Sequence, residues 1–579
     1  MATSFAPRRA PNAVAVRALT LALVAVALPA PRPARADGGS YASVYGRVGC
    51  AADAVVTPSS TQELADAIKS HATAAKAAGA ALKIRATHAV FHSSSSFPCV
   101  PPSPASPLPC ALSGSCGRGV AVFTDRLAGV LGADAGRRRL RVQAGIKVAE
   151  LLAECKRRGW APPIGAGTTY GGLTLGGVLA TNAHDSAYNG PSTLAHIVTE
   201  LTWVDAAGTI HTSPRDSDDA RALLGGIGLV GIIAEVEVAL QGTTNATPHL
   251  SVTWHPDIGL YSTFTKEATG EASTGARLSP LATMQPFEAP LLDAALKAWD
   301  GDVNDVAGPV FGAVGCLSTF LTSPTASFIS VPVGLPPLVG SVPGLAIPVS
   351  DGVGDANDML GCSCGGLPCA WDNGGPAAVE PREFVIELSD LGGWIADTRR
   401  VYEQELKQGG GGKRCLLGFV MFQFGSGSDA WLATTSGMRE PVHVITMLTK
   451  SRALSYSLPA KFGFVHDILE QMSLCKYGGR PHPGKNSERT FTHPGCPLAD
   501  RYPQMGKLLE AQARYDPGLV FEPPLFARIK AREGFRLSPG CDLRKECFCS
   551  EDAHCAAGFS CVPSRAFPQF RACKPPALI

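Results

Sequence analysis

Glycine is unusually dense between residues 165 and 177, and this feature constrains the fold more than any other in the chain. Six glycines fall in this stretch, and residues 178–184 (VLATNAH) follow it directly. Glycine takes φ > 0 without steric cost, and an ordinary turn rarely needs so many such positions. A plain turn is therefore disfavoured, and we expect the backbone to make a close approach here.

The residues on either side of this stretch predict alternating strands and helices. Residues 54–58 and 81–86 are typical of strands, and the Ala-rich segment between them is typical of a helix that Gly79 ends. Together they predict a β-α-β unit. A second series follows: we expect strands at 120–124, 140–143, 197–204, 208–212 and 232–240, and helices at 148–158 and from about 216.

One glycine motif in this region is not a dinucleotide fingerprint. Gly226-Ile-Gly228-Leu-Val-Gly231 matches G-x-G-x-x-G. That fingerprint must follow a strand and open a helix, whereas here a helix is expected before it and a strand after it. The sequence therefore argues against a Rossmann domain.

The first 36 residues have the pattern of a signal peptide. Arg8, Arg9 and Arg17 precede the apolar run 18–28, and Ala34–Ala36 fits a cleavage site. Eleven apolar residues are too few to cross a bilayer, which takes about 20. We expect cleavage near Ala36 and entry into the secretory pathway, giving a secreted or vacuolar protein with no stable membrane span and a glycosylation sequon at Asn245.

The chain has 18 cysteines, which suit an oxidising compartment. Six of them lie between residues 541 and 573, where few large apolar residues are available to build a core. Their spacing departs from the C-x2-C pairs of zinc sites, so we expect a disulfide module and no metal site. Fifteen pairings are open for six cysteines, and spacing does not choose among them.

The rest of the chain favours a globular, non-nucleic-acid-binding protein. Lys plus Arg number 51 against 49 Asp plus Glu, so the basic excess of a nucleic-acid binder is missing. Residues 251–254 and 384–388 alternate like strands, residues 395–406 and 458–475 are typical of helices, and residues 322–349 predict an irregular Pro-rich loop.

Four segments, in this order and spacing, carry a family resemblance: VVTPSSTQEL, VQAGIKVAELL, GGLTLGGVLATNAH and LLGGIGLVGIIAEVEVAL. They resemble the FAD domain of the vanillyl-alcohol-oxidase (PCMH) type. Within that group the chain is similar to sugar-lactone oxidases of the plant L-gulonolactone oxidase type, which share the segment Lys476–Asn486 (KYGGRPHPGKN) and the tail Cys547–Cys555 (CFCSEDAHC).

The resemblance implies an α+β fold of several parts. These are a two-lobed FAD-binding domain (45–242), a cap domain with an antiparallel sheet (243–530) that returns to the FAD domain, and the disulfide module (541–573). Glycines and small serines allow close N–H donors to a pyrophosphate at 85–96 and 171–184. The implied FAD-binding residues are Thr87, His92, Ser93, Gly171, Gly172, Thr174, Gly176, Gly177, Asn182, His184, Gly231 and Ile232.

His92 is the expected site of a covalent bond to the flavin. In the family, the histidine of a His-Ser pair after this strand forms such a bond, and His92-Ser93 stands at the matching place. A neutral imidazole is a competent nucleophile. A surface-loop histidine is the alternative, and His88 lies near enough to compete.

The catalytic residues that the resemblance implies are Lys485, His482 and Gln423. Lys485 would stabilise negative charge, with His482 beside it. The family's animal branch carries a Glu-x-Arg pair on a cap strand, and here the matching strand 418–424 has Met421 and Gln423 in those places. Gln423 offers hydrogen bonds but no charge, which leaves both the substrate and the catalytic competence open.

The resulting hypothesis is a flavin-dependent oxidation of an aldonolactone. L-gulono-1,4-lactone is the best substrate and molecular oxygen the expected acceptor, giving an ascorbate precursor and H2O2. Two alternatives stay open. One is an oxidase or dehydrogenase of the same fold that acts on another sugar or polyol. The other is a secreted binding protein that keeps the flavin fold and has lost catalysis.

Overall fold

A computed structural model describes residues 39–44, 48–100, 118–168, 170–188, 190–243, 249–271, 273, 289–302, 353–360, 377–407 and 414–579. Residues 38–579 form one compact unit. Several predicted features lie outside the described residues: the signal peptide, the sequon at Asn245, the Pro-rich loop 322–349, and Cys110, Cys116, Cys362, Cys364 and Cys369.

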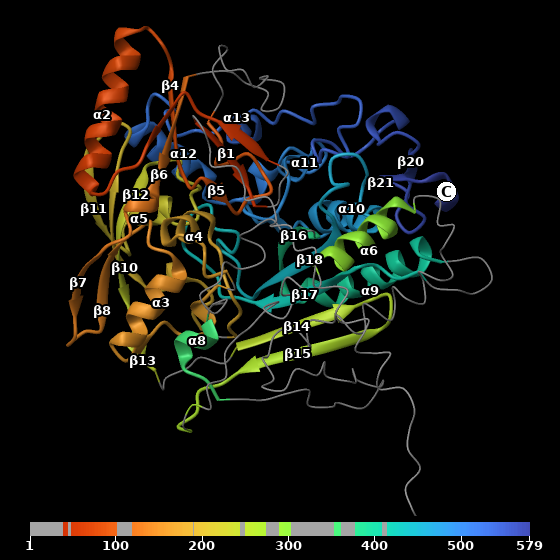
Figure 1. Cartoon of the computed structure of the whole chain (residues 1–579), viewed down its shortest axis with the longest axis horizontal. Coiled ribbons are helices and arrows are strands. Elements are labelled where there is room, and N and C mark those ends of the chain that lie inside the picture. Colours follow the sequence, from red (N-terminus) through yellow and green to blue (C-terminus); the bar gives the residue numbers. More distant parts are fainter. Residues whose placement is uncertain are drawn as a thin grey trace, which may run out of the picture. The chain divides into compact units, whose positions relative to one another are not determined.

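The first lobe contains a parallel three-stranded sheet in the order β3-β6-β4 (Figure 1). The β-α-β prediction is confirmed in its elements, but β6 lies between the two strands that the sequence placed next to each other. Helix α2 begins where Ser60 Oγ accepts the N–H of Glu63 at 3.1 Å, and Gly79 with φ +60° follows its end. The elements are β3 (Ala54–Val56), α2 (Thr61–Ala77), β4 (Leu82–Thr87) and β6 (Arg118–Phe123), with a small sheet of β1 (Ser40–Ser43), β2 (Gly49–Ala51) and β5 (Val90–Phe91).

The second lobe contains an antiparallel sheet in the order β11-β10-β12-β8-β7. The predicted strands and helices are present, with an additional edge strand, β7, that the sequence did not indicate. Helix α5 precedes residues 226–231 and β12 follows them, so the rejection of a Rossmann fingerprint is confirmed. The elements are β7 (Val130–Asp134), β8 (Arg139–Gln143), α3 (Val148–Arg157), β9 (Trp160–Ala161), α4 (Leu175–Thr181), β10 (Val198–Val204), β11 (Ile210–Pro214), α5 (Asp218–Leu223), β12 (Ile232–Ala239) and β13 (Gln241–Gly242).

The cap contains a six-stranded antiparallel sheet in the order β15-β14-β17-β18-β16-β19. Two predicted helices differ in extent: α9 begins seven residues earlier than expected, and α10 begins at Phe464 and continues into a π-helical turn, Met472–Lys476. The elements are β14 (His249–His255), β15 (Leu260–Lys266), α6 (Ala289–Gly301), α8 (Ala356–Leu360), β16 (Ala377–Glu387), α9 (Leu388–Glu405), β17 (Gly418–Phe424), β18 (Pro441–Ser451), α10 (Phe464–Gln471) and β19 (Arg480–Pro481).

The two faces of the cap sheet differ in chemistry because successive side chains of a strand point to opposite sides. One face is apolar and packs on α9 and α10 (Figure 1): Trp254, Val420, Phe422, Val442, Val444 and Ile386 share a core with Trp394, Val401, Val465 and Ile468. The other face is polar. Gln423 on β17 pairs in register with Ser251 on β14 and with His443 on β18. Glu383 lies on β16, the strand on the other side of β18.

The C-terminal region packs on the cap through buried charges. Arg489 is fully buried and bonds Asp467 at 2.5 Å, Glu470 at 2.7 Å and Asp542 at 2.9 Å. A buried charge is stable only when it is paired in this way. The elements here are α11 (Glu488–Phe491), α12 (Met505–Tyr515), α13 (Pro524–Lys530), β20 (Ser560–Pro563) and β21 (Arg571–Lys574).

Disulfides hold the tail module together, as the cysteine spacing predicted. Of the fifteen possible pairings the structure has Cys541–Cys547, Cys549–Cys561 and Cys555–Cys573. Cys50–Cys99 and Cys475–Cys496 are also bonded. Cys155 is free and buried, so complete pairing of the cysteines does not hold.

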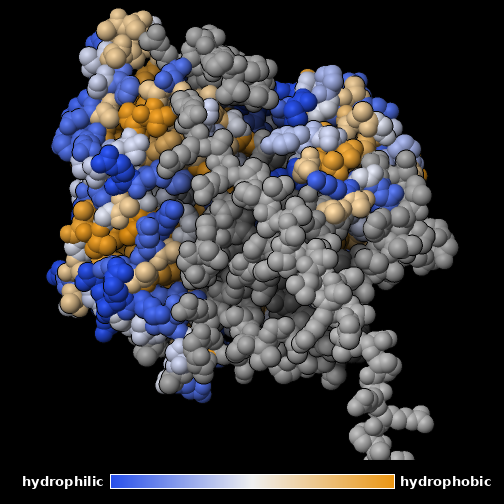
Figure 2. Space-filling model, viewed as in Figure 1, coloured by the Kyte–Doolittle hydropathy of each residue, from blue (hydrophilic) through white to orange (hydrophobic). Residues whose placement is uncertain are grey.

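The surface shown in Figure 2 is mostly hydrophilic where residues are described, with apolar patches among them. Val130 and Leu131 of the edge strand β7 are among the exposed apolar residues. Isolated exposed apolar side chains are ordinary on a protein surface. Among the described residues, no helix has the length and apolar character needed to cross a membrane.

Candidate active site

A buried carboxylate on the polar face of the cap sheet gathers side chains from distant parts of the chain. Oε1 of Glu383 accepts from Nε2 of His184 at 2.6 Å and from Nδ1 of His443 at 2.9 Å, and Oε2 pairs with Nζ of Lys485. We call these four residues the Glu383 cluster. His184 comes from the loop after the glycine-rich stretch, so the cluster joins the FAD-domain lobe to the cap.

The loop that carries Lys485 is fixed to the same strand. Oδ1 of Asn486 accepts the backbone N–H groups of Glu383 and His482, each at 3.1 Å. The N–H of His482 also reaches the carbonyl of Glu383 at 3.1 Å. Both Glu383 and Asn486 are fully buried. The loop therefore has a defined position against β16.

The charges of the cluster follow from its contacts. Burial alone would raise the pKa of Glu383, but His184, Lys485 and His482 hold that pKa well below its usual value. Nδ1 of His184 faces the carbonyl oxygen of Asp185 at 2.9 Å while its Nε2 faces Glu383. Both partners can only accept, so each ring nitrogen of His184 faces an acceptor.

The other two histidines are neutral. Burial, together with the charge of His184, lowers the pKa of His443 to about 4, and burial lowers that of His482 to about 3. Nδ1 of His482 accepts the N–H of Gly484 at 3.0 Å, so its proton sits on Nε2. The rings of His184 and His443 stack with centroids 3.4 Å apart, an arrangement that one neutral ring makes tolerable.

The predicted flavin loop lies against the predicted catalytic loop. The N–H of Ser94 donates to the carbonyl of Gly484 at 3.1 Å, and the hydroxyls of Ser93 and Ser95 donate to the carbonyl of Pro483 at 3.3 and 3.1 Å. A Cβ on Gly484 would lie 3.4 Å from the carbonyl oxygen of His92. The structure thus brings the loop of His92 and Ser93 against the loop that carries Lys485, although 390 residues separate Ser93 from Pro483.

The His92 ring lies beside the glycine-rich stretch, whereas the His88 ring is bonded elsewhere. The His92 ring lies 5.7 Å from that of Tyr170, at the edge of the glycine-rich stretch. His88 has both ring nitrogens engaged elsewhere, with Asp125 and with the backbone of Val90. Thr87, the third residue expected here, donates to the carbonyl of His88 at 3.4 Å.

Backbone hydrogen bonds hold the glycine-rich stretch against the second lobe. The carbonyl of Gly171 accepts the N–H of Ala149, and the N–H of Gly176 donates to the carbonyl of Ala144 at 2.7 Å. A Cβ on Gly176 would come within 3.2 Å of Ala144. Thr174 caps α4 by accepting from Gly177, and Asn182 ends it in the left-handed conformation. Gly172 lies within this stretch, between β9 and α4.

Gly231 and Ile232 lie in the lobe core. A Cβ on Gly231 would come within 2.5 Å of the Trp203 ring and 2.8 Å of the carbonyl oxygen of Val204. Ile232 is buried in the cluster that contains Val204 and Phe521. Packing alone therefore requires a glycine at 231, whatever its relation to FAD.

Gln423 is on the polar face, as expected, but it is tied to an acid from the other lobe. Its Nε2 donates to Oδ1 of Asp185 at 3.3 Å, and Oδ2 of Asp185 bonds Nζ of Lys266 at 3.2 Å. Asp185 and Lys266 are both buried. Where the animal branch carries a charged pair, this chain has the amide of Gln423, which bonds the ion pair of Asp185 and Lys266.

Two buried donors at the site have no hydrogen-bond partner among the described residues. These are Nε2 of His482 and Nδ2 of Asn486. An unsatisfied buried donor costs about 1–3 kcal/mol, so such groups call for an acceptor. Together with the Lys485 ammonium they form a donor set suited to the ring oxygens of a flavin or to substrate oxygens. The residues present fit FAD in this respect.

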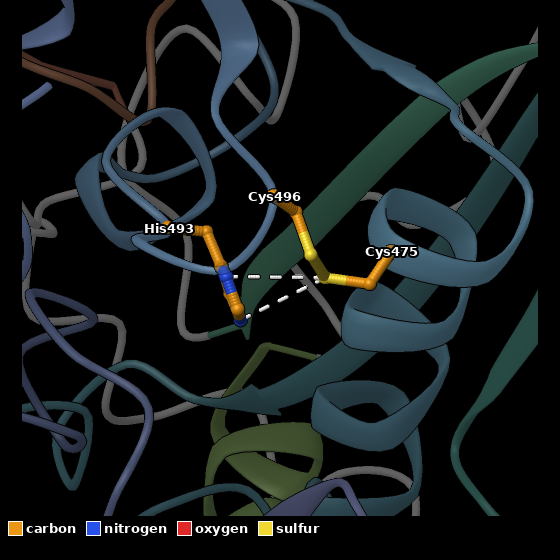
Figure 3. A group of neighbouring side chains, drawn as sticks. All are labelled: Cys475, His493 and Cys496. Carbon is orange, nitrogen blue, oxygen red and sulfur yellow. Dashed lines mark hydrogen bonds between the residues drawn. A yellow bond between two sulfur atoms is a disulfide. The ribbon is translucent and has the colours of Figure 1, made fainter.

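A disulfide closes the segment that carries the predicted catalytic loop. Cys475 and Cys496 lie 21 residues apart, on either side of His482, Lys485 and Asn486. Figure 3 shows the His493 ring beside the Cys475 sulfur, at 3.8 Å from Nε2. Because both sulfurs are in the disulfide, neither is a thiolate available to a metal.

His184, Glu383 and His443 also offer nitrogen and oxygen atoms that could bind a metal ion, and these atoms lie within 4.8 Å of one another. The ammonium of Lys485 already stands against Glu383 there.

Comparison with known proteins agrees with this fold. A family model described as an FAD binding domain matches residues 110–213, and one described as the C-terminal domain of L-gulonolactone oxidase 2-like proteins matches residues 538–575. A solvent-stable cholesterol oxidase aligns with 87% of this chain and 100% of its own (TM-score 0.55, 17% identity). Cholesterol oxidase from B. sterolicum aligns with 87% and 99% (TM-score 0.56, 14% identity).

These matches confirm the predicted fold and cofactor, and the chain is an FAD-dependent oxidoreductase. Within this class it is similar to plant L-gulonolactone oxidases over most of its length. Arabidopsis thaliana L-gulonolactone oxidase 2 is 24% identical over 96% of this chain and 95% of that protein. L-gulonolactone oxidase 5 of the same plant is 24% identical over 79% of this chain and 80% of its own length.

Sequence reasoning missed Glu383, His443 and Asp185. Asp185 directly follows His184, and His443 lies opposite Gln423, so neither was far from a residue already singled out. Glu383 precedes the strand predicted at 384–388, and extending the alternation by one residue would have placed it on the polar face. An acid directly before the alternating segment was the available signal.

Proposed function

We propose that this protein oxidises an aldonolactone with FAD, with L-gulono-1,4-lactone as the best substrate and molecular oxygen as the acceptor. The observation that carries the proposal is that His184 and Lys485 meet at the buried Glu383, with His482 beside them and with the His92 loop against the Lys485 loop. The sequence similarity to L-gulonolactone oxidases supports the choice of lactone.

FAD supplies the acceptor for the hydride that leaves the carbinol carbon. In this proposal the loops 92–96 and 171–184 hold the cofactor, with Thr87, Gly231 and Ile232 also in its domain, and His92 is the residue for covalent attachment. The hydroxyls of Ser93 and Ser95 are already engaged by the carbonyl of Pro483, so they position the loop.

Lys485 and His482 stabilise negative charge as it develops. The Lys485 side chain keeps about a fifth of its surface exposed, while the carboxylate that holds it is fully buried. Its ammonium is therefore anchored at one end and open at the site. His482 presents the N–H of Nε2 from the same loop. Donors fixed before the reaction avoid the reorganisation cost that water would incur.

Gln423 is the proposed contact for a neutral substrate oxygen. Because its Nε2 is held by Asp185, its carbonyl oxygen is the group left to accept from a substrate hydroxyl. A lactone ring rich in hydroxyls and lacking a charge fits such an acceptor. This arrangement equally favours the second candidate, an oxidoreductase of the same fold that acts on another neutral sugar or polyol.

A secretory location belongs to the same proposal. The disulfides of the tail and of the catalytic segment need an oxidising compartment, and the N-terminal 36 residues have the pattern that leads there. Such an enzyme meets oxygen more readily than soluble electron carriers. Oxygen is therefore the proposed oxidant, and H2O2 the second product.

The test is a substrate panel on the purified chain. The protein should be yellow, and L-gulono-1,4-lactone should drive oxygen uptake with equimolar H2O2, more efficiently than other lactones, alditols or cholesterol. Turnover of an alditol alone would favour the second candidate. A yellow protein inert to the whole panel would favour a binding protein that has lost catalysis. Flavin that stays with the protein after acid precipitation supports attachment at His92.

A further inference from the structure

We propose that Glu383 is the positioning residue that fixes the Lys485 ammonium against the flavin. This inference rests on the proposed FAD site but not on the identity of the substrate. It starts from a residue that neither the sequence motifs nor the similar proteins pointed to. Its carboxylate and both its backbone groups are engaged with the residues of the site and its loop.

The first step is that both carboxylate oxygens of Glu383 are engaged by residues of the site. It is fully buried, and a buried carboxylate is costly unless cations and donors compensate it. Each of its two oxygens has a partner at the site: Oε1 faces His184 and His443, and Oε2 faces Lys485. No apolar residue could take its place without leaving Lys485 and His184 unpaired.

The second step is that Lys485 needs an anchor. A lysine side chain has four rotatable bonds and about 2 kcal/mol of rotamer entropy, so an ammonium alone does not define a position. The backbone of the loop is held by Asn486 and by the contacts of Gly484 with Ser94. The ion pair with Glu383 then fixes the end of the side chain.

The third step is the position of the loop that carries the ammonium. The carbonyl of Gly484, which precedes Lys485, accepts the N–H of Ser94, so the backbone of the Lys485 loop lies against the loop of His92. Any group bonded to His92 or cradled by residues 92–96 is therefore adjacent. Glu383 also bonds His184 from the FAD-domain lobe, so its carboxylate contacts residues from both the lobe and the cap.

Sulfite binding separates this role from a simple charge effect. Sulfite adds reversibly to flavin N5, and a positive charge near the flavin pyrimidine ring strengthens the adduct, which is followed by loss of the visible flavin bands. This readout needs no lactone. If Glu383 acted only as a nearby negative charge, Glu383→Gln would tighten sulfite binding. If it positions Lys485, the same change weakens it.

We expect Glu383→Gln and Lys485→Met each to weaken sulfite binding at least about tenfold, the effect of losing one charge-assisted hydrogen bond. Glu383→Asp, which keeps the charge but shortens the reach, should lie between them and the unchanged protein. Glu387→Gln is the matched control on the same strand, where the carboxylate only accepts the N–H groups of Arg439 and Glu440, and it should leave sulfite binding as it is.

Three results would overturn the proposal. The first is a tighter sulfite adduct in Glu383→Gln, and the second is unchanged affinity in both Glu383 variants. The third is loss of flavin from both variants, which would make Glu383 a structural link between lobe and cap. Failure of the lactone assay with the expected sulfite pattern would instead reject the proposed substrate and keep the positioning role.

Discussion

Nε2 of His184 lies 2.6 Å from Oε1 of Glu383, and 199 residues separate the two. His184 ends the segment that follows the glycine-rich stretch, and Glu383 lies on β16 of the cap sheet. The bond therefore connects the part of the chain that resembles a flavin-binding lobe with the part that would cover the flavin. Lys485 completes the link from a third segment.

Replacing Lys485 should slow flavin reduction without releasing the flavin. Lys485→Met removes one preorganised positive group, and the loss of one such donor lowers the rate by about 100-fold or more. The rate is measured by anaerobic stopped-flow mixing with substrate. Lys476→Met is the control, because Lys476 lies in the same disulfide-closed segment but pairs with Asp397 at the surface. Equal rates in both variants would contradict the assigned role.

Acid should destabilise the protein from about pH 6.5 downward. His443 is neutral in the fold with its pKa lowered to about 4, and His466 and His482 with theirs at about 3, all because of burial. The unfolded chain binds protons at these sites below about pH 6.5, so stability falls as pH drops from there toward the folded values.

Glu383 adds to this loss at lower pH, because its depressed pKa contributes stability that disappears as the carboxylate is protonated. Each fully buried histidine shifted to about 4 is worth on the order of 3 kcal/mol. A Tm followed from pH 7 to pH 4.5 should therefore fall steeply. A flat profile would contradict the burial of neutral histidines.

Opening the disulfide of the catalytic segment should cost stability more than function. The double change Cys475→Ser with Cys496→Ser should lower the free energy of unfolding by about 3 kcal/mol, given the length of the closed loop. Flavin should stay bound, since Asn486 and Arg489 still anchor the segment. The pair Cys541→Ser and Cys547→Ser closes a shorter loop and should cost about 2 kcal/mol. Chemical denaturation compares the two, and a reversed order would argue against loop entropy.

Gly231 should be intolerant of alanine because of packing. Gly231→Ala would place a Cβ 2.5 Å from the Trp203 ring and should cost about 1–3 kcal/mol through overpacking. Gly242→Ala meets nothing within 4 Å and serves as the control. Thermal denaturation of the two variants checks this. If Gly231→Ala were as stable as the control and yet lost flavin, the residue would belong to the cofactor site.

Local patterns carried much of the fold. The Ser60 cap and Gly79 set the ends of α2, and alternation marked β14 and β16, because these signals act over a few residues. The position of β6 between β3 and β4 could not be read in this way, since strand order depends on contacts between distant segments. The pairing of the tail cysteines was open for the same reason.

The residues of the candidate site likewise fall into those that sequence motifs indicated and those that only the structure revealed. His92, His184, His482 and Lys485 were found through motifs, and the structure brings them together. Glu383 has no motif of its own, and its importance comes from neighbours on three other segments. Gln423 was singled out through the strand that carries it, but its bond to Asp185 crosses from cap to lobe, which no local pattern indicates.

The most direct test of the central claim is an anaerobic titration of the purified protein with L-gulono-1,4-lactone, followed by its visible spectrum. The account predicts that the bands of oxidised flavin disappear with lactone and return on admission of air, with H2O2 formed. Flavin that dithionite reduces but the lactone leaves oxidised would contradict it.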